Sequence, residues 1–315
     1  MHDSGPEPNR ILLFSTAQNL RMLARAQHIF ADGTFKTTPQ PLFEQLYSIH
    51  ANLGDRVTPL VFCLLKQKDV NTYERMLNIV KGLATRMNPE TITTDFEEAS
   101  IVAFHNVFPN ARQKGCYFHF GQCVWRRIQR EPAVLRRYKS DTVFAVNVRY
   151  LGALSFVPPD EVVNAYETLC DSAFFQDNQC LDPILDYFER NWVGQLNTRT
   201  HIRRAPRHAI ELWNNRTAVL NGEYLTTNSV EGWHRQLNGR IGCTHPNIWK
   251  YLTSLQDEQL LVAMKIQGYL RGDTHRHCPK YERVYARIKT AAGSWGQIHT
   301  IDYLEGIALN LEWKV

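Results

Sequence analysis

The sequence predicts a mixed α/β protein whose sheet is interrupted by a long helical insertion. Three observations lead to this fold class. Short apolar stretches with strand-like spacing come first, helix-like spacing dominates afterwards, and the segment 132–222 is unusually rich in aromatic residues and arginine. The chain has 315 residues, of which 43% are hydrophobic and 21% charged. This balance is typical of globular proteins, and the length fits one large domain or a core with an inserted subdomain.

Three strands are predicted near the start. Residues 29–35 form a short β-type run, and residues 44–53 alternate between apolar and polar side chains. Residues 57–65 are almost continuously apolar, as expected for a central strand that is buried on both faces. Because the connections between these runs are short, the three strands are expected to form an antiparallel meander.

Helices and strands then alternate up to residue 128. A helix capped by Asp69 or Asn71 is followed by a strand at 91–96, a helix at 97–108, a strand at 111–118 and another helix. The resulting order is β-β-β-α-β-α-β-α, which is the order of the RNase H-like fold. Several other α/β folds share parts of it.

Residues 132–222 are predicted to be an all-helical insertion before the last helix of the core. That last helix, capped by Thr226 or Asn228, runs to Ile241, and residues 249–270 continue as helix. Two more helices are expected between residues 280 and 311. The predicted division is a lead-in at 1–25, the core in two pieces at 26–131 and 223–262, the insertion at 132–222 and a C-terminal helical segment at 263–315.

Composition limits the cellular setting and the partners. The net charge of +5 and the pI of 8.8 permit a polyanionic partner without requiring one. The seven cysteines include no Cys-x-x-Cys pair, so a reducing compartment fits better than a disulfide framework. The sequence shows neither a signal-peptide pattern nor a run of 18 apolar residues. A soluble intracellular protein is therefore expected, without a membrane partner.

Three carboxylates are candidate functional residues. Asp32 lies within a strand that has no other charge, where it is costly unless paired, although an edge-strand Asp can simply face solvent. Asp95 ends a strand, the position that opens onto the ligand crevice of an α/β sheet, although it can also cap the next helix. Glu231 borders the apolar stripe of a helix. Its simpler role is an i,i+4 pair with Arg235, worth about 0.2–0.5 kcal/mol.

Together the three carboxylates suggest a catalytic metal site. Two Mg²⁺ or Mn²⁺ ions about 3.5–4 Å apart need several hard oxygen ligands. Carboxylates from a first strand, a fourth strand and a later helix converge in this way in an RNase H-like arrangement. Such a site would support in-line phosphoryl transfer, with one ion activating water or a 3′-hydroxyl and the other stabilising the leaving oxygen.

Four motifs resemble the MULE (Mutator-like element) transposase domain. They are FADGTFK at 30–36, TDFE at 94–97, GCYFHFGQ at 115–122 and NSVEGW at 228–233. The similarity extends from about residue 11 to 240. The resemblance implies a nuclear DDE-type DNA transposase that cleaves and joins strands at transposon ends, with Asp32, Asp95 and Glu231 as metal ligands. It also implies double-stranded DNA, from transposon ends and target, as partner and action as a homo-oligomer on DNA.

Cys116 and His119 belong to the same family pattern. Their spacing suggests half a zinc site, and Cys123 follows one turn later. A closed zinc site needs four ligands, and Cys243 or His245 would complete it only if the fold brought them close. Packing near the active site is the interpretation favoured over bound zinc, and a contact with DNA stays open.

Basic residues alternate with aromatic ones in three segments, and in two of them six arginines are candidate DNA contacts. They are Arg126, Arg127, Arg130, Arg203, Arg204 and Arg207. Arginine clusters neutralise phosphates and make the affinity salt-dependent. The alternative for each cluster is a solvated helix face, because acidic residues lie nearby in the sequence.

Two other functions remain in competition with an active transposase. One is a domesticated, catalytically silent DNA-binding or regulatory protein, whose role would survive an Asp95→Ala change. The other is an RNase H-like exonuclease. Such enzymes usually carry a second carboxylate two residues after the first, whereas this chain has Thr34 there.

Overall fold

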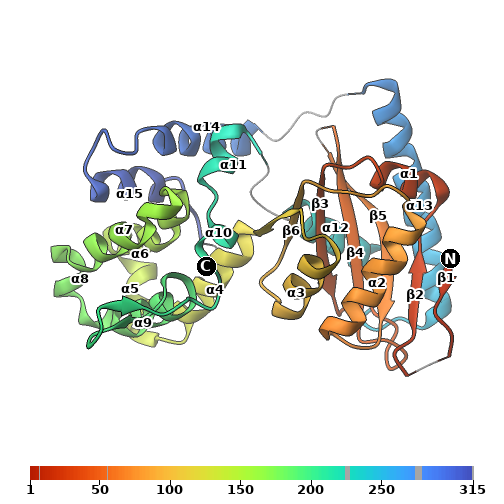
Figure 1. Ribbon diagram of the computed structural model, residues 1–315, viewed down its shortest axis with the longest axis horizontal. Helices are drawn as coiled ribbons and strands as arrows, with labels where there is room; N and C mark the ends of the chain where they lie inside the picture. Colours follow the sequence, from red (N-terminus) through yellow and green to blue (C-terminus); the bar gives the residue numbers. More distant parts are fainter. Residues whose placement is uncertain (7, 55, 224–227, 274–278, 314–315) are drawn as a thin grey trace. The chain divides into compact units, whose positions relative to one another are not determined.

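The computed structural model describes residues 1–6, 8–54, 56–223, 228–273 and 279–313. The chain forms two compact units, shown in Figure 1, and each is described by itself. The first unit contains residues 1–114 and 226–276, and the second contains residues 115–225 and 277–315. The five-part division made from the sequence stays a prediction.

A seven-stranded mixed sheet forms the centre of the first unit. Its strand order is β1-β2-β5-β4-β3-β6-β7. Strands β3, β4 and β5 form the expected antiparallel meander, and β6 pairs with β3 in parallel. The strands are β1 His2–Asp3, β2 Ile11–Phe14, β3 His28–Thr34, β4 Gln45–Leu53, β5 Arg56–Leu65, β6 Thr91–Thr94 and β7 Arg112–Gly115.

The sheet extends further than the sequence predicted. No element was expected before residue 29, yet β1, β2 and α1 (Ala17–Leu23) lie there, and β2 pairs antiparallel with β5. A four-residue apolar run such as Ile11–Phe14 carries too little periodicity to identify a strand. Its pairing with a strand about fifty residues later is a tertiary event.

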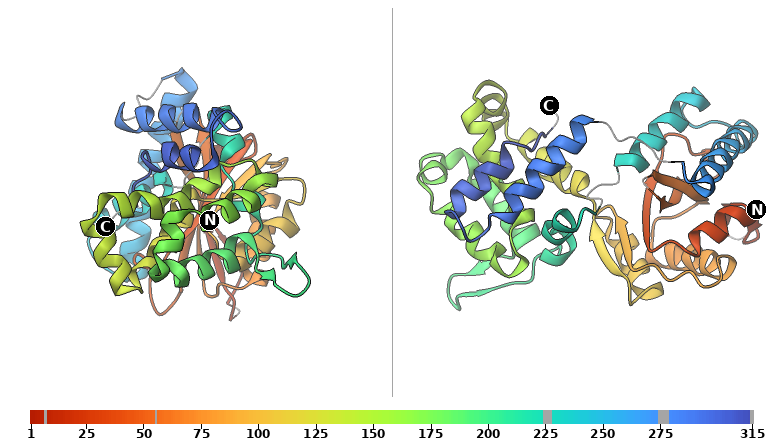
Figure 2. Two further views of the ribbon diagram at one scale, coloured as in Figure 1. Left: turned by 90° about the vertical axis from the view of Figure 1, so that its left-hand side faces the viewer. Right: turned by 90° about the horizontal axis from the view of Figure 1, so that it is seen from above.

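Helices cover both faces of this sheet. On one face lie α1, α12 (Asn228–Ile241) and α13 (Ile248–Arg271), and on the other lie α2 (Val70–Leu83) and α3 (Glu98–Val107), as the right view of Figure 2 shows. Asp69 caps α2, as predicted, by accepting a 2.9 Å hydrogen bond from the Thr72 N–H. The predicted cap of α12 lies outside the described residues, which exclude Thr226 and the side chain of Asn228.

The second unit is mainly helical, and its core is aromatic. Phe120 on α4 contacts Trp192 and Trp213, with ring centroids 4.8 and 5.1 Å apart. The α-helices are α4 Tyr117–Gln129, α5 Pro132–Ser140, α6 Thr142–Ala153, α7 Val162–Cys170, α8 Ala173–Asp177, α9 Asp182–Phe188, α10 Ile210–Trp213, α11 Arg216–Asn221, α14 Pro279–Gly293 and α15 Thr300–Ala308. Short helical turns link some of them, and these are η1 Leu154–Phe156, η2 Pro159–Glu161, η3 Gln179–Leu181 and η4 Glu189–Val193. None of the described helices is long and apolar enough to span a membrane.

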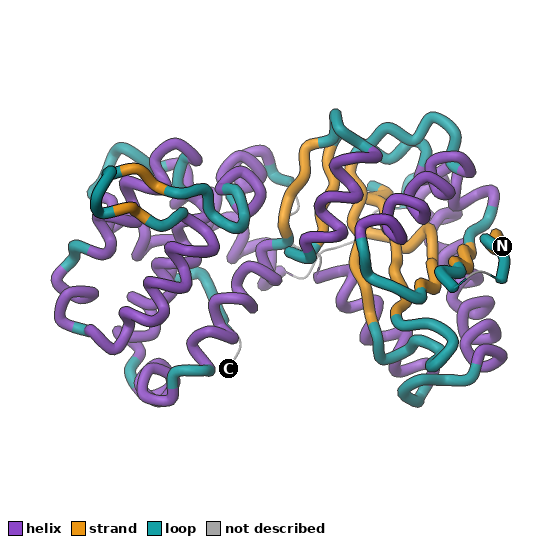
Figure 3. Tube along the Cα trace, turned by 60° about the horizontal axis from the view of Figure 1, so that its bottom comes forward, coloured by secondary structure: helices purple, strands orange, loops and turns teal. Residues whose placement is uncertain are grey.

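The prediction that residues 132–222 are all-helical is wrong. Strands β8 (Leu196–Asn197) and β9 (Ile202–Arg203) form a small hairpin, drawn in orange within the helical unit in Figure 3. Later in this segment α10 and α11 are two separate short helices. The break falls at Asn214, whose side chain donates to the Val157 carbonyl and accepts from the Arg216 N–H. Such side-chain bonds compete with helical hydrogen bonding.

Gly194, just before this hairpin, should resist substitution. Its φ is +96°, and a Cβ there would lie 2.0 Å from the Arg204 carbonyl oxygen. We expect Gly194→Ala to lower the free energy of unfolding by more than the roughly 1–3 kcal/mol of backbone strain alone. Gly222→Ala is the matched control, because Gly222 has φ +80° with nothing within 4 Å. If urea unfolding showed the same loss of unfolding free energy for Gly194→Ala and Gly222→Ala, the steric argument would be wrong.

Candidate active site

Asp32 lies on β3 beneath helix α12. It is 5% exposed, and it pairs with Ser48 on β4, which pairs in turn with Phe62 on β5. Paired residues of neighbouring strands point to the same face of a sheet, so these three side chains form one row. The ring of Trp233 on α12 packs against Phe62 with centroids 5.4 Å apart, which places α12 over this row.

Asp95 follows the last residue of β6. In the parallel ladder Phe30 pairs with Thr93. Counting two residues further along each strand places Asp95 beside Asp32, past the last recorded pair. The Asp95 carboxylate accepts a 3.1 Å hydrogen bond from the Glu97 N–H. Asp32 on β3 and Asp95, which directly follows the neighbouring parallel strand β6, therefore lie side by side.

The negative charges of the two aspartates act on the same neighbouring side chains. Burial raises the pKa of Tyr47, and the negative charges of Asp95 and Asp32 add to this effect. Burial likewise raises the pKa of Glu97, again with contributions from Asp95 and Asp32. The site thus concentrates negative charge, which is the field that attracts a divalent cation.

Glu231 reaches this region on the first turn of α12. The helix buries Val230, Trp233, Leu237 and Ile241, and it packs on β3 and β5. Glu231 itself is half-buried. Across the described ranges, however, no three His, Cys, Asp or Glu side chains are grouped closely enough to hold a metal ion as they stand. The structure therefore places the three predicted carboxylates in one unit, with α12 over β3, without a closed metal-binding cluster.

His234 is a residue that the sequence analysis did not single out for function. It lies one turn after Glu231, and its Nδ1 is 3.6 Å from the Asp32 carboxylate. Both side chains are nearly inaccessible to solvent. Sequence spacing contained a signal, because residues three apart on a helix share a face.

Glu97 is a fourth carboxylate that the sequence analysis did not propose. Its Oε2 accepts a 2.9 Å hydrogen bond from the Tyr73 hydroxyl, which in turn accepts a 2.7 Å bond from the Gln45 amide. Glu97 is half-buried and immediately precedes α3. A carboxylate at this position also favours the N-terminus of the helix.

Replacing Glu97 with glutamine should stabilise the protein at neutral pH. Because its folded-state pKa is raised, first of all by burial, the favourable contribution of Glu97 is complete below its unfolded pKa and is lost as pH rises through its folded pKa. Glu97→Gln removes that loss. In urea unfolding between about pH 4 and pH 8, the free energy of unfolding of the variant should increase relative to that of the wild type as pH rises. Glu44→Gln is the control, because Glu44 is exposed, and it should show no such increase. The same increase in both variants would refute the role of Glu97.

Cys116 and His119 lie at the start of α4 in the second unit. Cys116 is fully buried and is the N-cap residue of the helix, while His119 and Cys123 are half-buried. Cys243 and His245 belong to the first unit. Among the described side chains none of these residues is part of a metal-binding group. A zinc site at Cys116 and His119 stays a prediction that was not favoured.

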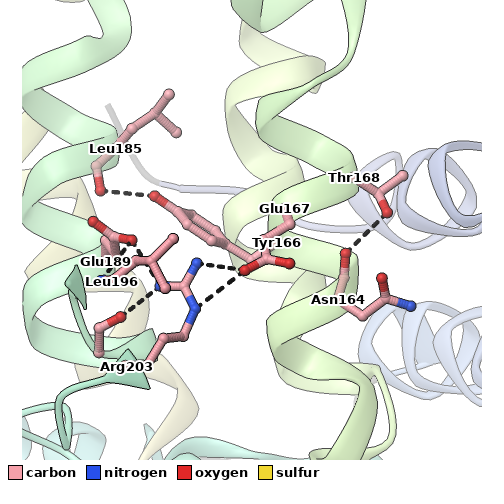
Figure 4. Close-up of polar contacts among 9 residues, drawn as sticks. Asn164, Tyr166, Glu167, Thr168, Leu185, Glu189, Leu196 and Arg203 are labelled. Carbon is pink, nitrogen blue, oxygen red and sulfur yellow. Dashed lines mark hydrogen bonds and ion pairs between the residues drawn. The ribbon is translucent and has the colours of Figure 1, made fainter. Parts of the chain in front are cut away.

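The six predicted DNA-contacting arginines fall into two kinds. The guanidinium of Arg203 binds Glu167 at 2.8 Å and Glu189 at 2.7 Å, as Figure 4 shows, and Arg127 pairs with Glu131 at 2.8 Å. The charges of these two arginines are balanced within the protein. The other four are Arg126, Arg130, Arg204 and Arg207, and their side chains are exposed.

Comparison with known families supports the resemblance stated from the motifs. Residues 28–122 match the family model of the MULE transposase domain. The matched segment includes Asp32, Asp95, Cys116 and His119, and it ends before Glu231. The resemblance is therefore confirmed for this segment, which contains β3 to β7. Among curated proteins, none matches the chain.

Proposed function

We propose that this chain is the catalytic core of a DDE-type DNA transposase with an RNase H-like fold. One observation carries the proposal: within the segment that matches the MULE transposase domain, Asp32 on β3 and Asp95 directly after the neighbouring parallel strand β6 lie side by side, under a helix that carries Glu231. The strand order β5-β4-β3-β6-β7 supports the fold assignment. Strand β3, which carries Asp32, has the antiparallel strands β4 and β5 on one side and the later strands β6 and β7 on the other.

The donor set fits Mg²⁺ or Mn²⁺ better than a softer metal. Asp32, Asp95 and Glu231 offer carboxylate oxygens, the ligands that these ions prefer. Two bound ions would activate the attacking water or 3′-hydroxyl and stabilise the leaving oxygen. Because the three side chains are not closely grouped as they stand, we propose that the Glu231 side chain changes rotamer toward the aspartates when the ions and DNA bind, while helix α12 keeps its place.

The surrounding residues prepare the aspartates for this role. The Gly33 N–H donates to Asp32 Oδ1 at 2.8 Å, and the Glu97 N–H donates to Asp95 Oδ1 at 3.1 Å. Each aspartate therefore keeps one oxygen anchored to the backbone. Anchored carboxylates lose less conformational freedom on binding a ligand, which is how a site is preorganised.

Double-stranded DNA, from transposon ends and target, is the proposed partner. Four exposed arginines are suited to phosphate contacts. Arg126 lies on α4 and Arg130 directly follows it, and Arg204 and Arg207 follow β9. Arg126 is hydrogen-bonded to the neutral Gln122 at 3.2 Å, so its charge is not balanced by that bond. We further propose action in the nucleus, as a homo-oligomer on paired DNA ends.

The two kinds of arginine should behave differently when replaced. We expect Arg126→Gln with Arg130→Gln to weaken DNA binding for all sequences and to reduce the slope of log affinity against log salt by about 1 per lost contact. Arg203→Gln should leave that slope unchanged. It should instead lower the free energy of unfolding, because Glu189 and Glu167 lose their ion-pair partner. Fluorescence anisotropy over a salt series measures the slope, and urea unfolding measures the stability. A slope change for Arg203→Gln alone would reverse the assignment.

The proposed activity is tested with the full chain, MnCl₂ and supercoiled plasmid DNA. Active enzyme converts the plasmid to the nicked form only when Mn²⁺ or Mg²⁺ is present. DNA binding without nicking, together with no detectable Mn²⁺ binding, would instead support the catalytically silent DNA-binding protein. Absence of both DNA and metal binding would refute both.

A further inference from the structure

A buried chain of polar side chains leads from strand β4 to Asp32. His50 Nε2 lies 2.9 Å from Ser48 Oγ, and Ser48 Oγ lies 3.0 Å from His234 Nε2. The other ring nitrogen of His234, Nδ1, lies 3.6 Å from the Asp32 carboxylate. His50 and Ser48 are completely inaccessible to solvent, and His234 is 6% exposed. Polar groups are rarely buried in such a chain unless their hydrogen bonds are mutually satisfied.

The direction of hydrogen-bond donation along these polar side chains is inferred from the residues at the two ends, Asp32 and His50. At one end His234 Nδ1 faces an oxygen of the Asp32 side chain at 3.6 Å, and we assign the ring proton to that nitrogen because an N–H is the partner that an oxygen accepts from. At the other end, burial lowers the pKa of His50 well below its ordinary value, so that ring is neutral and has one N–H. His50 Nδ1 is buried without a hydrogen-bond partner. Nδ1 can be either an unpaired N–H donor or an unpaired acceptor, and a buried unpaired acceptor is the less costly. We therefore assign the single N–H of His50 to Nε2.

His50 Nε2–H donates to Ser48 Oγ. The Ser48 hydroxyl has two acceptors within reach, His234 Nε2 at 3.0 Å and the Asp32 main-chain carbonyl oxygen at 3.3 Å. We assign its proton to the shorter contact, so that His234 Nε2 accepts and His234 Nδ1–H faces the Asp32 side chain. The last separation is longer than a full hydrogen bond, as is common at catalytic sites before ligands bind. Every donor in the chain therefore points toward the Asp32 carboxylate.

We propose that His234 is a positioning residue that orients the Asp32 carboxylate for divalent-metal binding, and that Ser48 and His50 keep His234 in the tautomer that donates to it. This inference rests on the proposed function. It also gives α12 a mechanical role, because the same helix carries Glu231 one turn before His234. Through this contact, the strand that carries Asp32 and the helix that carries Glu231 are held at a defined separation.

A merely structural role is a competing explanation, because His50 and His234 also pack against Trp233. Both ring centroids lie 5.1 Å from that of Trp233. Two substitutions separate packing from positioning. In His234→Asn the amide nitrogen occupies roughly the place of Nδ1 and can donate to Asp32. In His234→Gln the amide reaches the place of Nε2 and can contact Ser48, but the donor to Asp32 is lost.

The test measures Mn²⁺ affinity of the full chain by electron paramagnetic resonance. We expect His234→Gln to weaken Mn²⁺ binding by about 10–100-fold, the usual loss when a residue that orients a metal ligand is changed. His234→Asn should retain most of the wild-type affinity. Circular dichroism and urea unfolding check that both variants fold equally well. Equal affinity losses in the two variants, or no loss in either, overturn the proposal.

A metal-independent measurement tests the chain itself. Long-range ¹H–¹⁵N spectra of the histidine rings distinguish the two tautomers. The proposal requires the proton on Nδ1 of His234 and on Nε2 of His50, and it requires Ser48→Ala to change the His234 pattern. A protonated Nε2 with a bare Nδ1 on His234 overturns it. If the wild type binds no Mn²⁺, the metal role of His234 fails together with the proposed function. If Mn²⁺ binds and the tautomers are wrong, the inference alone fails.

Discussion

Asp95→Asn should reduce Mn²⁺-dependent nicking of plasmid DNA by about 10³-fold or more, because removing one anionic oxygen ligand withdraws several kcal/mol of transition-state stabilisation. The change is nearly isosteric. The amide that replaces the carboxylate keeps an oxygen that can accept from the Glu97 N–H, as Asp95 does at 3.1 Å. The fold should therefore survive, and the loss of nicking would reflect the missing charge.

A matched control lies three residues away. Glu98→Gln makes the same charge change on an exposed side chain in the first turn of α3. It removes a helix-dipole contribution of about 0.3–1 kcal/mol and should leave nicking intact. The rates are compared at saturating Mn²⁺ with equal amounts of folded protein. If Asp95→Asn nicked at the wild-type rate, the Asp95 carboxylate would not be part of the catalytic site.

The largest loss of stability should follow Glu258→Ala. Glu258 on α13 is fully buried, accepts a 2.7 Å hydrogen bond from Trp233 Nε1 and forms an ion pair with Arg240. Removing the carboxylate leaves a buried indole N–H and a guanidinium without their partner. Breaking a buried ion pair costs about 3–5 kcal/mol, and we expect the lower end of that range because the Arg240 side chain is 37% exposed and can turn to water. Urea unfolding followed by tryptophan fluorescence measures the loss.

The control for this prediction is an exposed pair at the C-terminal end of the same helix. Arg271 and Asp273 form an ion pair at 3.0 Å, with side chains 70% and 59% exposed. Asp273→Ala should change the free energy of unfolding by no more than about 1 kcal/mol. Since Trp233 and Arg240 both lie on α12, Glu258→Ala should also weaken Mn²⁺ binding. Wild-type stability in Glu258→Ala would show that α12 is held by apolar packing alone.

Much of the architecture was predictable because it depends on local patterns. The meander at residues 29–65 follows from short apolar runs with strand spacing, and the start of α2 follows from the cap that Asp69 provides. The two helices expected between residues 280 and 311 are confirmed as α14 and α15. The motifs around Asp32 and Asp95 identified the MULE transposase domain, which the match at residues 28–122 confirms.

Other features had no local signal. Strand β2 is too short to recognise, and it forms only because β5 offers a free edge. The β8–β9 hairpin interrupts a segment whose composition is helical, and Arg203 is held there by two carboxylates from α7 and η4. Basic composition alone cannot distinguish such a balanced arginine from an exposed one.

Side-chain periodicity and short spacings in the sequence are enough to predict most of the strands and helices, the positions of Asp32, Asp95 and Glu231 in them, and the family that the motifs resemble. The buried polar contacts of Ser48, His50 and His234 beside Asp32 could not be predicted, and they are visible only in the folded structure. The physical reason is that these contacts join β4 to a helix 186 residues later in the sequence and depend on burial, which is a property of the folded molecule.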